Sequence, residues 1–107
     1  MTVRLCQWSD VLEGIPLRVV GPRSRQLAVF RVGEEVYVTE AACTHGRAWL
    51  TEGGQQGHHV HCPLHGGVFD VRTGASVSPP CTVALRTYRA RVEAGFVNLA
   101  AEPTETR

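Results

Sequence analysis

The sequence predicts an all-β domain, built as a sandwich or a barrel. Short runs of β-branched and aromatic residues recur along the chain, and turn residues separate them at regular, close spacing. No stretch has the length and the 3.6-residue period of a long amphipathic helix. With 107 residues, the chain has room for one domain with a modest core.

Taken in order, the expected strands are residues 3–8, 16–20, 26–32, 36–39, 58–61, 68–71, 85–92 and 96–99. A short turn at residues 33–35 predicts a hairpin between the third and fourth strands, and Ala94-Gly95 predicts another hairpin near the end of the chain. We expect a single helical turn at residues 11–13, with Ser9 or Asp10 as its cap.

Composition excludes several classes of function. The net charge of +1 gives no reason to expect a nucleic acid or a membrane surface as partner. No apolar run is long enough for a signal peptide or a membrane helix, so a cytoplasmic location is the default expectation. Four cysteines without an export signal argue against a disulfide framework.

Two short stretches carry the chemistry: Cys43-Thr44-His45 and Cys62-Pro63-Leu64-His65. Two thiolates and two imidazoles suit zinc, or a [2Fe–2S] centre in which histidines have replaced two cysteines on one iron. Zinc sites usually pair cysteine with cysteine and histidine with histidine along the chain. Here each stretch offers one of each, which favours two loops that clamp a two-iron cluster from opposite sides.

Extended to Gly46 and to Gly66-Gly67, the two stretches resemble the two cluster-binding boxes of Rieske proteins. The similarity is greatest to the small Rieske ferredoxins of bacterial ring-hydroxylating oxygenases, and it covers nearly the whole chain. It implies a single Rieske domain over residues 1–107, in which stacked antiparallel sheets carry a two-loop cluster-binding subdomain at about residues 42–81.

The resemblance also implies a role for each ligand. Cys43 and Cys62 would hold the iron that stays ferric, and His45 and His65 would hold the iron that is reduced. The protein would be an electron carrier and not an enzyme. It would take one electron from a flavin-containing reductase and pass it to the terminal oxygenase of an aromatic hydrocarbon dioxygenase system.

The surroundings of the boxes predict a low redox potential. Rieske proteins of high potential have an extra, disulfide-linked cysteine in each box and hydroxyl side chains after the second histidine. Here Leu64, Gly67 and Phe69 occupy those places. Fewer donors to the sulfurs should put the potential near the low end of a range of roughly −150 to +300 mV. Gly46, Gly66 and Gly67 are expected at positive φ, with N–H groups that can donate to the cluster.

The remaining residues of interest are not expected to be cluster ligands. His58, His59 and His61 are taken as exposed strand residues beside the second box, and Cys6 and Cys81 as buried or half-buried thiols. Pro79-Pro80 resembles the family's loop over the cluster. Trp49 is either buried beneath the first box or exposed for docking. The arginines of the strand expected at residues 85–92 are taken as lying on its solvated face: Arg86, Arg89 and Arg91.

Three alternative functions stay open. They are the ferredoxin of a toluene-type diiron monooxygenase, the Rieske-like small subunit of a nitrite reductase, and a structural zinc-binding module. A visible spectrum separates the zinc module from the others, because zinc is colourless.

Overall fold

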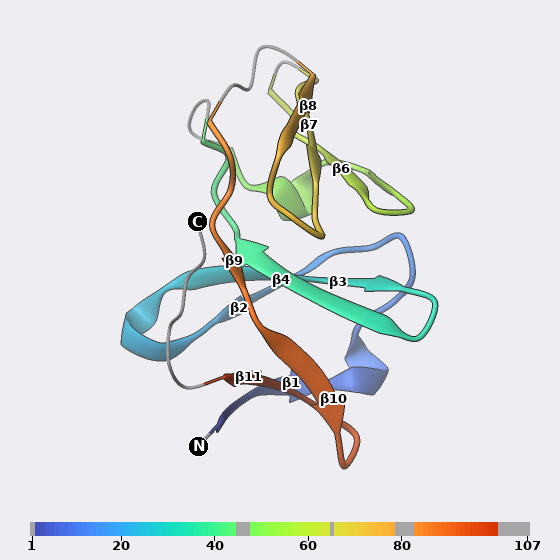
Figure 1. Ribbon diagram of the computed structural model, residues 1–107, viewed down its shortest axis with the longest axis vertical. Coiled ribbons are helices and arrows are strands. Elements are labelled where there is room, and N and C mark those ends of the chain that lie inside the picture. Colours follow the sequence, from blue (N-terminus) through green and yellow to red (C-terminus); the bar gives the residue numbers. More distant parts are fainter. Residues whose placement is uncertain (1, 45–47, 65, 79–82, 101–107) are drawn as a thin grey trace.

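Three antiparallel sheets make up the protein, a computed structural model of which describes residues 2–44, 48–64, 66–78 and 83–100 (Figure 1). The first sheet has the order β1 (Thr2–Gln7), β11 (Phe96–Ala100), β10 (Ala90–Glu93). The second has β2 (Leu17–Val20), β3 (Gln26–Val32), β4 (Glu35–Glu40), β9 (Thr87–Tyr88). The third has β5 (Gln55–Gln56), β6 (His59–His61), β7 (Val68–Asp70), β8 (Ser76–Ser78). The predicted all-β class is confirmed.

Within the described residues, helical structure is limited to single 3₁₀ turns. These are η1 (Trp8–Asp10), η2 (Pro22–Ser24) and η3 (Leu50–Glu52). In the part of the chain that the structure describes, no helix combines the length and the hydrophobicity needed to cross a membrane.

The second sheet lies between the other two (Figure 1). Its strand β3 is buried on both faces, since Leu27 and Val29 pack into one core and Ala28 and Phe30 into the other. The lower core in Figure 1 joins β3 to β1 and β11, through residues such as Val97. The upper core joins β3 to the third sheet. It consists of Ala28, Phe30, Ala41, Cys43, Leu50, Val60, Cys62, Phe69, Val71 and Leu85.

Both predicted hairpins are present. Strands β3 and β4 pair up to Val32 and Glu35, and β10 pairs with β11 up to Glu93 and Phe96. Ala94 and Gly95 form the second turn with φ values of 56° and 81°. Positive φ at both central residues is the two-residue turn that matches the right-handed twist of a hairpin.

Two sequence expectations are wrong in detail. The helical turn lies at Trp8–Asp10 rather than at residues 11–13, without a side-chain cap, because Val11 is extended and completely buried. The strand expected over residues 85–92 is split, because β9 pairs with β4 whereas β10 pairs with β11. The chain therefore changes sheets at Arg89.

Candidate metal centre

Each box of the sequence begins in a connection between neighbouring elements. The first connects β4 with η3, where Ala42 and Trp49 form an isolated antiparallel bridge. The second connects β6 with β7, which pair up to His61 and Val68. Both loops therefore start from a paired base on the upper side of the second sheet (Figure 1).

The two loops are fastened in the same way. The N–H of Cys43 donates to the carbonyl of Ala48 at 2.9 Å, and the N–H of Cys62 donates to the carbonyl of Gly67 at 2.8 Å. In both loops the acceptor lies five positions after the cysteine. Each cysteine is thus the residue at which the loop leaves its paired base, so its backbone is held by the fold.

The two cysteine side chains belong to the same buried cluster. Cys43 is 5% exposed and Cys62 is 2% exposed, and both belong to the upper core with Leu50, Val60 and Phe69. Thiolates are soft ligands suited to zinc and to iron–sulfur clusters. Two thiols brought from separate loops into one apolar site fit one side of a metal cluster.

The predicted histidine ligands, His45 and His65, lie outside the described residues, as do Gly46, Cys81 and Pro79-Pro80. Their described neighbours are closer to solvent than the cysteines. Thr44 is half-buried, and its hydroxyl donates to the carbonyl of Val83 at 2.7 Å. Leu64 is 46% exposed. Among the described residues, no group of three or more His, Cys, Asp or Glu side chains could hold a metal ion.

The described glycines after the second box differ from each other. Gly66 has the expected positive φ of 77°, and its N–H donates to the carbonyl of Cys62 at 3.1 Å. Gly67 is buried and is not among the glycines with positive φ, so that expectation is wrong for it. Gly67 contributes to the loop through its carbonyl, which accepts the hydrogen bond from the N–H of Cys62, and not through a positive φ.

Trp49 combines the two alternatives considered from the sequence. It is half-buried and packs against the upper core that contains both cysteines. The guanidinium carbon of Arg18 lies 4.2 Å from the centre of its ring. The indole is therefore covered by a cation on the outside and supports the thiol cluster from the inside.

The histidines before the second box differ in exposure. His59 is exposed on β6, whereas His58 and His61 are half-buried and His58 precedes the strand. The ring of His58 contacts Tyr37 edge to face, with 5.5 Å between ring centres. The expectation of exposed strand residues is thus confirmed only for His59. Cys6 is half-buried and has a free thiol, as expected.

Sequence reasoning missed the role of Gly53, which was read only as part of a turn. A Cβ at this position would lie 1.7 Å from the carbonyl oxygen of His61. Because His61 precedes Cys62, this close approach of two backbones sets the position of the second box. The Gly53-Gly54 pair was the only signal in the sequence.

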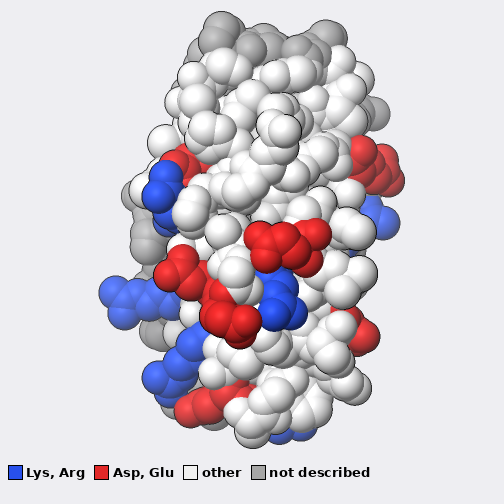
Figure 2. Space-filling view, turned by 90° about the vertical axis from the view of Figure 1, so that its right-hand side faces the viewer, with Lys and Arg blue, Asp and Glu red and all other residues white. Residues whose placement is uncertain are grey.

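The end of the molecule that carries the boxes has few charges. Residues 53–69 and 73–85 contain no Asp, Glu, Lys or Arg. On the face shown in Figure 2, charged side chains are scattered over the middle and lower parts and are absent from the described atoms at the top.

An ion pair lies on the border of this region. Arg72 donates hydrogen bonds from its side chain and its backbone to Asp70, and they hold the pKa of that carboxyl below its ordinary value.

Comparison with known proteins decides which family this site belongs to. The family model for the Rieske [2Fe-2S] domain matches residues 1–89. The chain belongs to the Rieske [2Fe–2S] family. The Rieske chain is 44% identical to ferredoxin CarAc of Metapseudomonas resinovorans over 100 residues, which are 94% of each protein. Its cofactor is accordingly a Rieske-type [2Fe–2S] cluster.

Two solved structures show the same Rieske fold. A ferredoxin of Sphingomonas yanoikuyae B1 superimposes with a TM-score of 0.90 at 42% identity, covering 95% of this chain and 100% of that one. The ferredoxin in a complex of reduced oxygenase and oxidised ferredoxin of carbazole 1,9a-dioxygenase has a TM-score of 0.86 at 44% identity. That match covers 94% of both chains.

Proposed function

We propose that this Rieske protein is the ferredoxin component of a bacterial aromatic ring-hydroxylating oxygenase system. It takes up one electron from a flavin-containing reductase and delivers it to the terminal oxygenase, and it does so in the cytoplasm. The observation that carries the proposal is the pair of buried thiols, held by equivalent loop closures at one end of the fold. Similarity along nearly the whole chain to ferredoxins of such systems supports the partners.

The proposed ligands are Cys43 and Cys62 on one iron and His45 and His65 on the other. When bound, the cluster supplies a site for one electron. The protein's own contribution is to bury the thiolates in an apolar core and to fix their backbone through the loop closures. Two neutral imidazoles in place of two thiolates would leave less negative charge to oppose the added electron.

The proposed contact with partners lies at the end that carries the boxes. Exposed apolar side chains occur there on or beside the loops, at Leu64, Val77 and Val83. Charged residues are sparse in the same segments. A carrier must release its partner quickly, so we expect a small contact around His45 and His65 with few ion pairs.

Substitution of the proposed ligands tests the site. We expect Cys43→Ser, Cys62→Ser, His45→Ala and His65→Ala each to abolish the native visible spectrum and the electron paramagnetic resonance signal after dithionite reduction. Cys6→Ala is the matched control, because Cys6 lies in β1 and its neighbours belong to the lower core. A native signal in either histidine variant would contradict the ligand assignment.

Electron transfer tests the function separately. The dithionite-reduced protein is mixed, in the absence of oxygen, with the oxidised oxygenase of the carbazole system. Its visible spectrum should then return to that of the oxidised protein. Persistence of the reduced spectrum in the presence of a competent oxygenase would contradict the proposed delivery, while leaving the cluster assignment intact.

A further inference from the structure

A hollow with two arginines lies on the side of the second sheet, away from the boxes. It has a volume of about 450 Å³, including the part open to solvent. Its seven lining residues are Pro22, Arg23, Arg25, Leu27, Tyr88, Leu99 and Ala100. They come from the β2–β3 connection, from β3, from β9 and from the end of β11.

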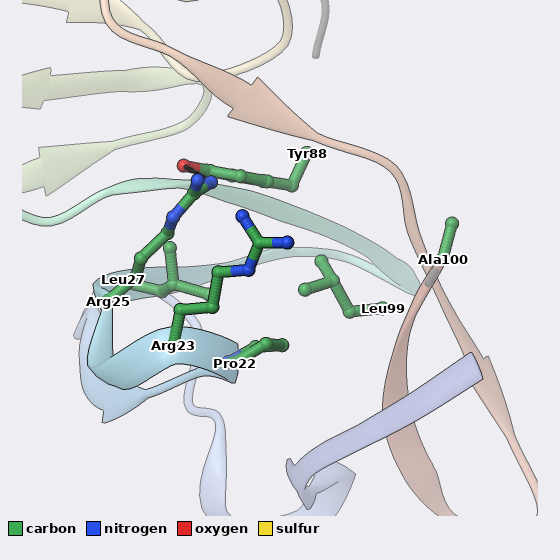
Figure 3. A pocket seen from close by; sticks show the side chains of 7 residues that line it. All are labelled: Pro22, Arg23, Arg25, Leu27, Tyr88, Leu99 and Ala100. Atoms are coloured by element: carbon green, nitrogen blue, oxygen red, sulfur yellow. Dashed lines mark hydrogen bonds between the residues drawn. The ribbon is translucent and has the colours of Figure 1, made fainter. Parts of the chain in front are cut away.

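The hollow has an apolar floor and a cationic rim. Leu27 and Leu99 are only 1% and 5% exposed, so they contribute apolar atoms at the base. Figure 3 shows both guanidinium groups pointing toward Tyr88 above this floor. Arg25 donates to the hydroxyl of Tyr88 at 3.3 Å, which holds one group in place.

Among the described residues, no acidic side chain neutralises the two guanidinium groups. None of the seven lining residues is acidic. Across the described residues, neither Arg23 nor Arg25 takes part in an ion pair. Two like charges side by side repel each other, and an anion between them would remove that repulsion. All eleven basic residues of the chain are arginines, whose planar fork can bind a carboxylate through two hydrogen bonds.

The backbone that presents the arginines is strained. Arg23 and Ser24 have φ values of 62° and 61°, so two consecutive non-glycine residues adopt the left-handed conformation. Such residues persist only where the surroundings enforce them, and they concentrate at binding sites. Arg23 and Arg25, on either side of Ser24, both line the hollow.

We propose that this hollow is a binding site for an organic carboxylate. The carboxylate lies between the guanidinium groups of Arg23 and Arg25, and an apolar body, such as an aromatic ring, lies on Leu27 and Leu99. The ligand with this chemistry is a free acid of the benzoate type.

Nuclear magnetic resonance titration of the cluster-loaded, ¹⁵N-labelled protein with sodium benzoate at constant ionic strength tests the site. Saturable shifts are expected at the amides of Leu27, Tyr88, Leu99 and Ala100, with a Kd in about the millimolar range for so small a ligand. Acetate and benzyl alcohol, which keep only the charge or only the ring, should each bind at least about tenfold more weakly.

Variants identify the groups that bind the carboxylate. Arg23→Gln and Arg25→Gln should each weaken benzoate binding about tenfold, whereas Arg91→Gln, on exposed β10, should leave it unchanged. Absence of saturable shifts, or equal binding of benzyl alcohol and benzoate, would overturn the proposal.

Discussion

At the scale of single residues, the carboxyl of Asp70 connects stability to pH. Arg72 lowers its pKa through hydrogen bonds, the shortest being 2.8 Å from a guanidinium nitrogen to Oδ2. A depressed folded pKa means that the stabilisation is present above the unfolded pKa of about 3.9 and is lost as pH falls through the folded value. The ion pair joins Asp70, where the turn after β7 begins, to Arg72 within that turn.

We therefore predict that Asp70→Asn lowers the free energy of unfolding at pH 7 by about 1 kcal/mol. The same variant should show a weaker loss of stability between about pH 4 and pH 2 than the parent protein, as measured by denaturant unfolding at each pH. Glu34→Gln is the control, since the Glu34 side chain is 87% exposed and its pair with Arg31 is long, at 3.6 Å. An unchanged acid profile in Asp70→Asn would contradict the assignment.

Gly53 and Gly54 provide a second comparison at residue scale. Gly53 has an ordinary φ of −92°, so it is required for space and not for its conformation. A methyl group there would meet the carbonyl of His61, whereas at Gly54 it would meet nothing within 4 Å.

We predict that Gly53→Ala costs about 1–3 kcal/mol and reduces the iron content of the purified protein. Gly54→Ala should stay within about 0.5 kcal/mol of the parent and keep full iron content. Thermal unfolding and iron analysis measure both. Equal behaviour of the two variants would show that the second box does not depend on this contact.

At the scale of elements, the turn between β10 and β11 is not optimal. Ala94 occupies a left-handed position at φ 56°, where asparagine is better tolerated than alanine, and Gly95 follows at φ 81°.

We predict that Ala94→Asn raises the free energy of unfolding by about 0.5 kcal/mol, and the melting temperature by roughly 2–4 °C. Gly95→Ala should lower the stability by about 1 kcal/mol, because an alanine at this position would have to adopt a positive φ, which its Cβ makes unfavourable. A lower melting temperature for Ala94→Asn would show that the turn is not limited by this strain.

The sequence predicts elements well where the pattern is local. The apolar run of β3, the hairpin turns and the two boxes are all visible as residue types at fixed spacing. The short strands β5 and β8 were missed, because Gln55-Gln56 and Ser76-Val77-Ser78 are mostly polar and form no apolar run. The break at Arg89 was missed because it depends on which sheet each half joins, a tertiary choice. The meeting of Cys43 and Cys62 in one core was inferred from chemistry and family resemblance, and not from any local pattern.

At the scale of the whole molecule, the two cores should respond differently to loss of the cluster. The upper core contains both proposed thiolate ligands, whereas the lower core contains neither. A ligand that binds only the folded state stabilises the part that it holds together.

We predict that removal of iron by a chelator under reducing conditions lowers the melting temperature and exposes β6 and β7 first. Hydrogen exchange should show that their amides lose protection while those of β1 and β11, which pair with each other over Thr2–Gln7, remain slow. A uniform loss of protection over all three sheets would mean that the cluster supports the fold as a single unit.

The position of β3 between two cores has a consequence for how this chain can vary. On β2 and β10, every second side chain is exposed to water, so a polar side chain at those positions would stay solvated. From Leu27 to Phe30 no such place exists, since all four side chains are buried. In a library of variants, all four positions should therefore be intolerant of polar substitution, without the alternation between tolerant and intolerant positions that usually marks a strand. A substitution there would disturb the lower core or the upper core that contains the proposed thiolate ligands.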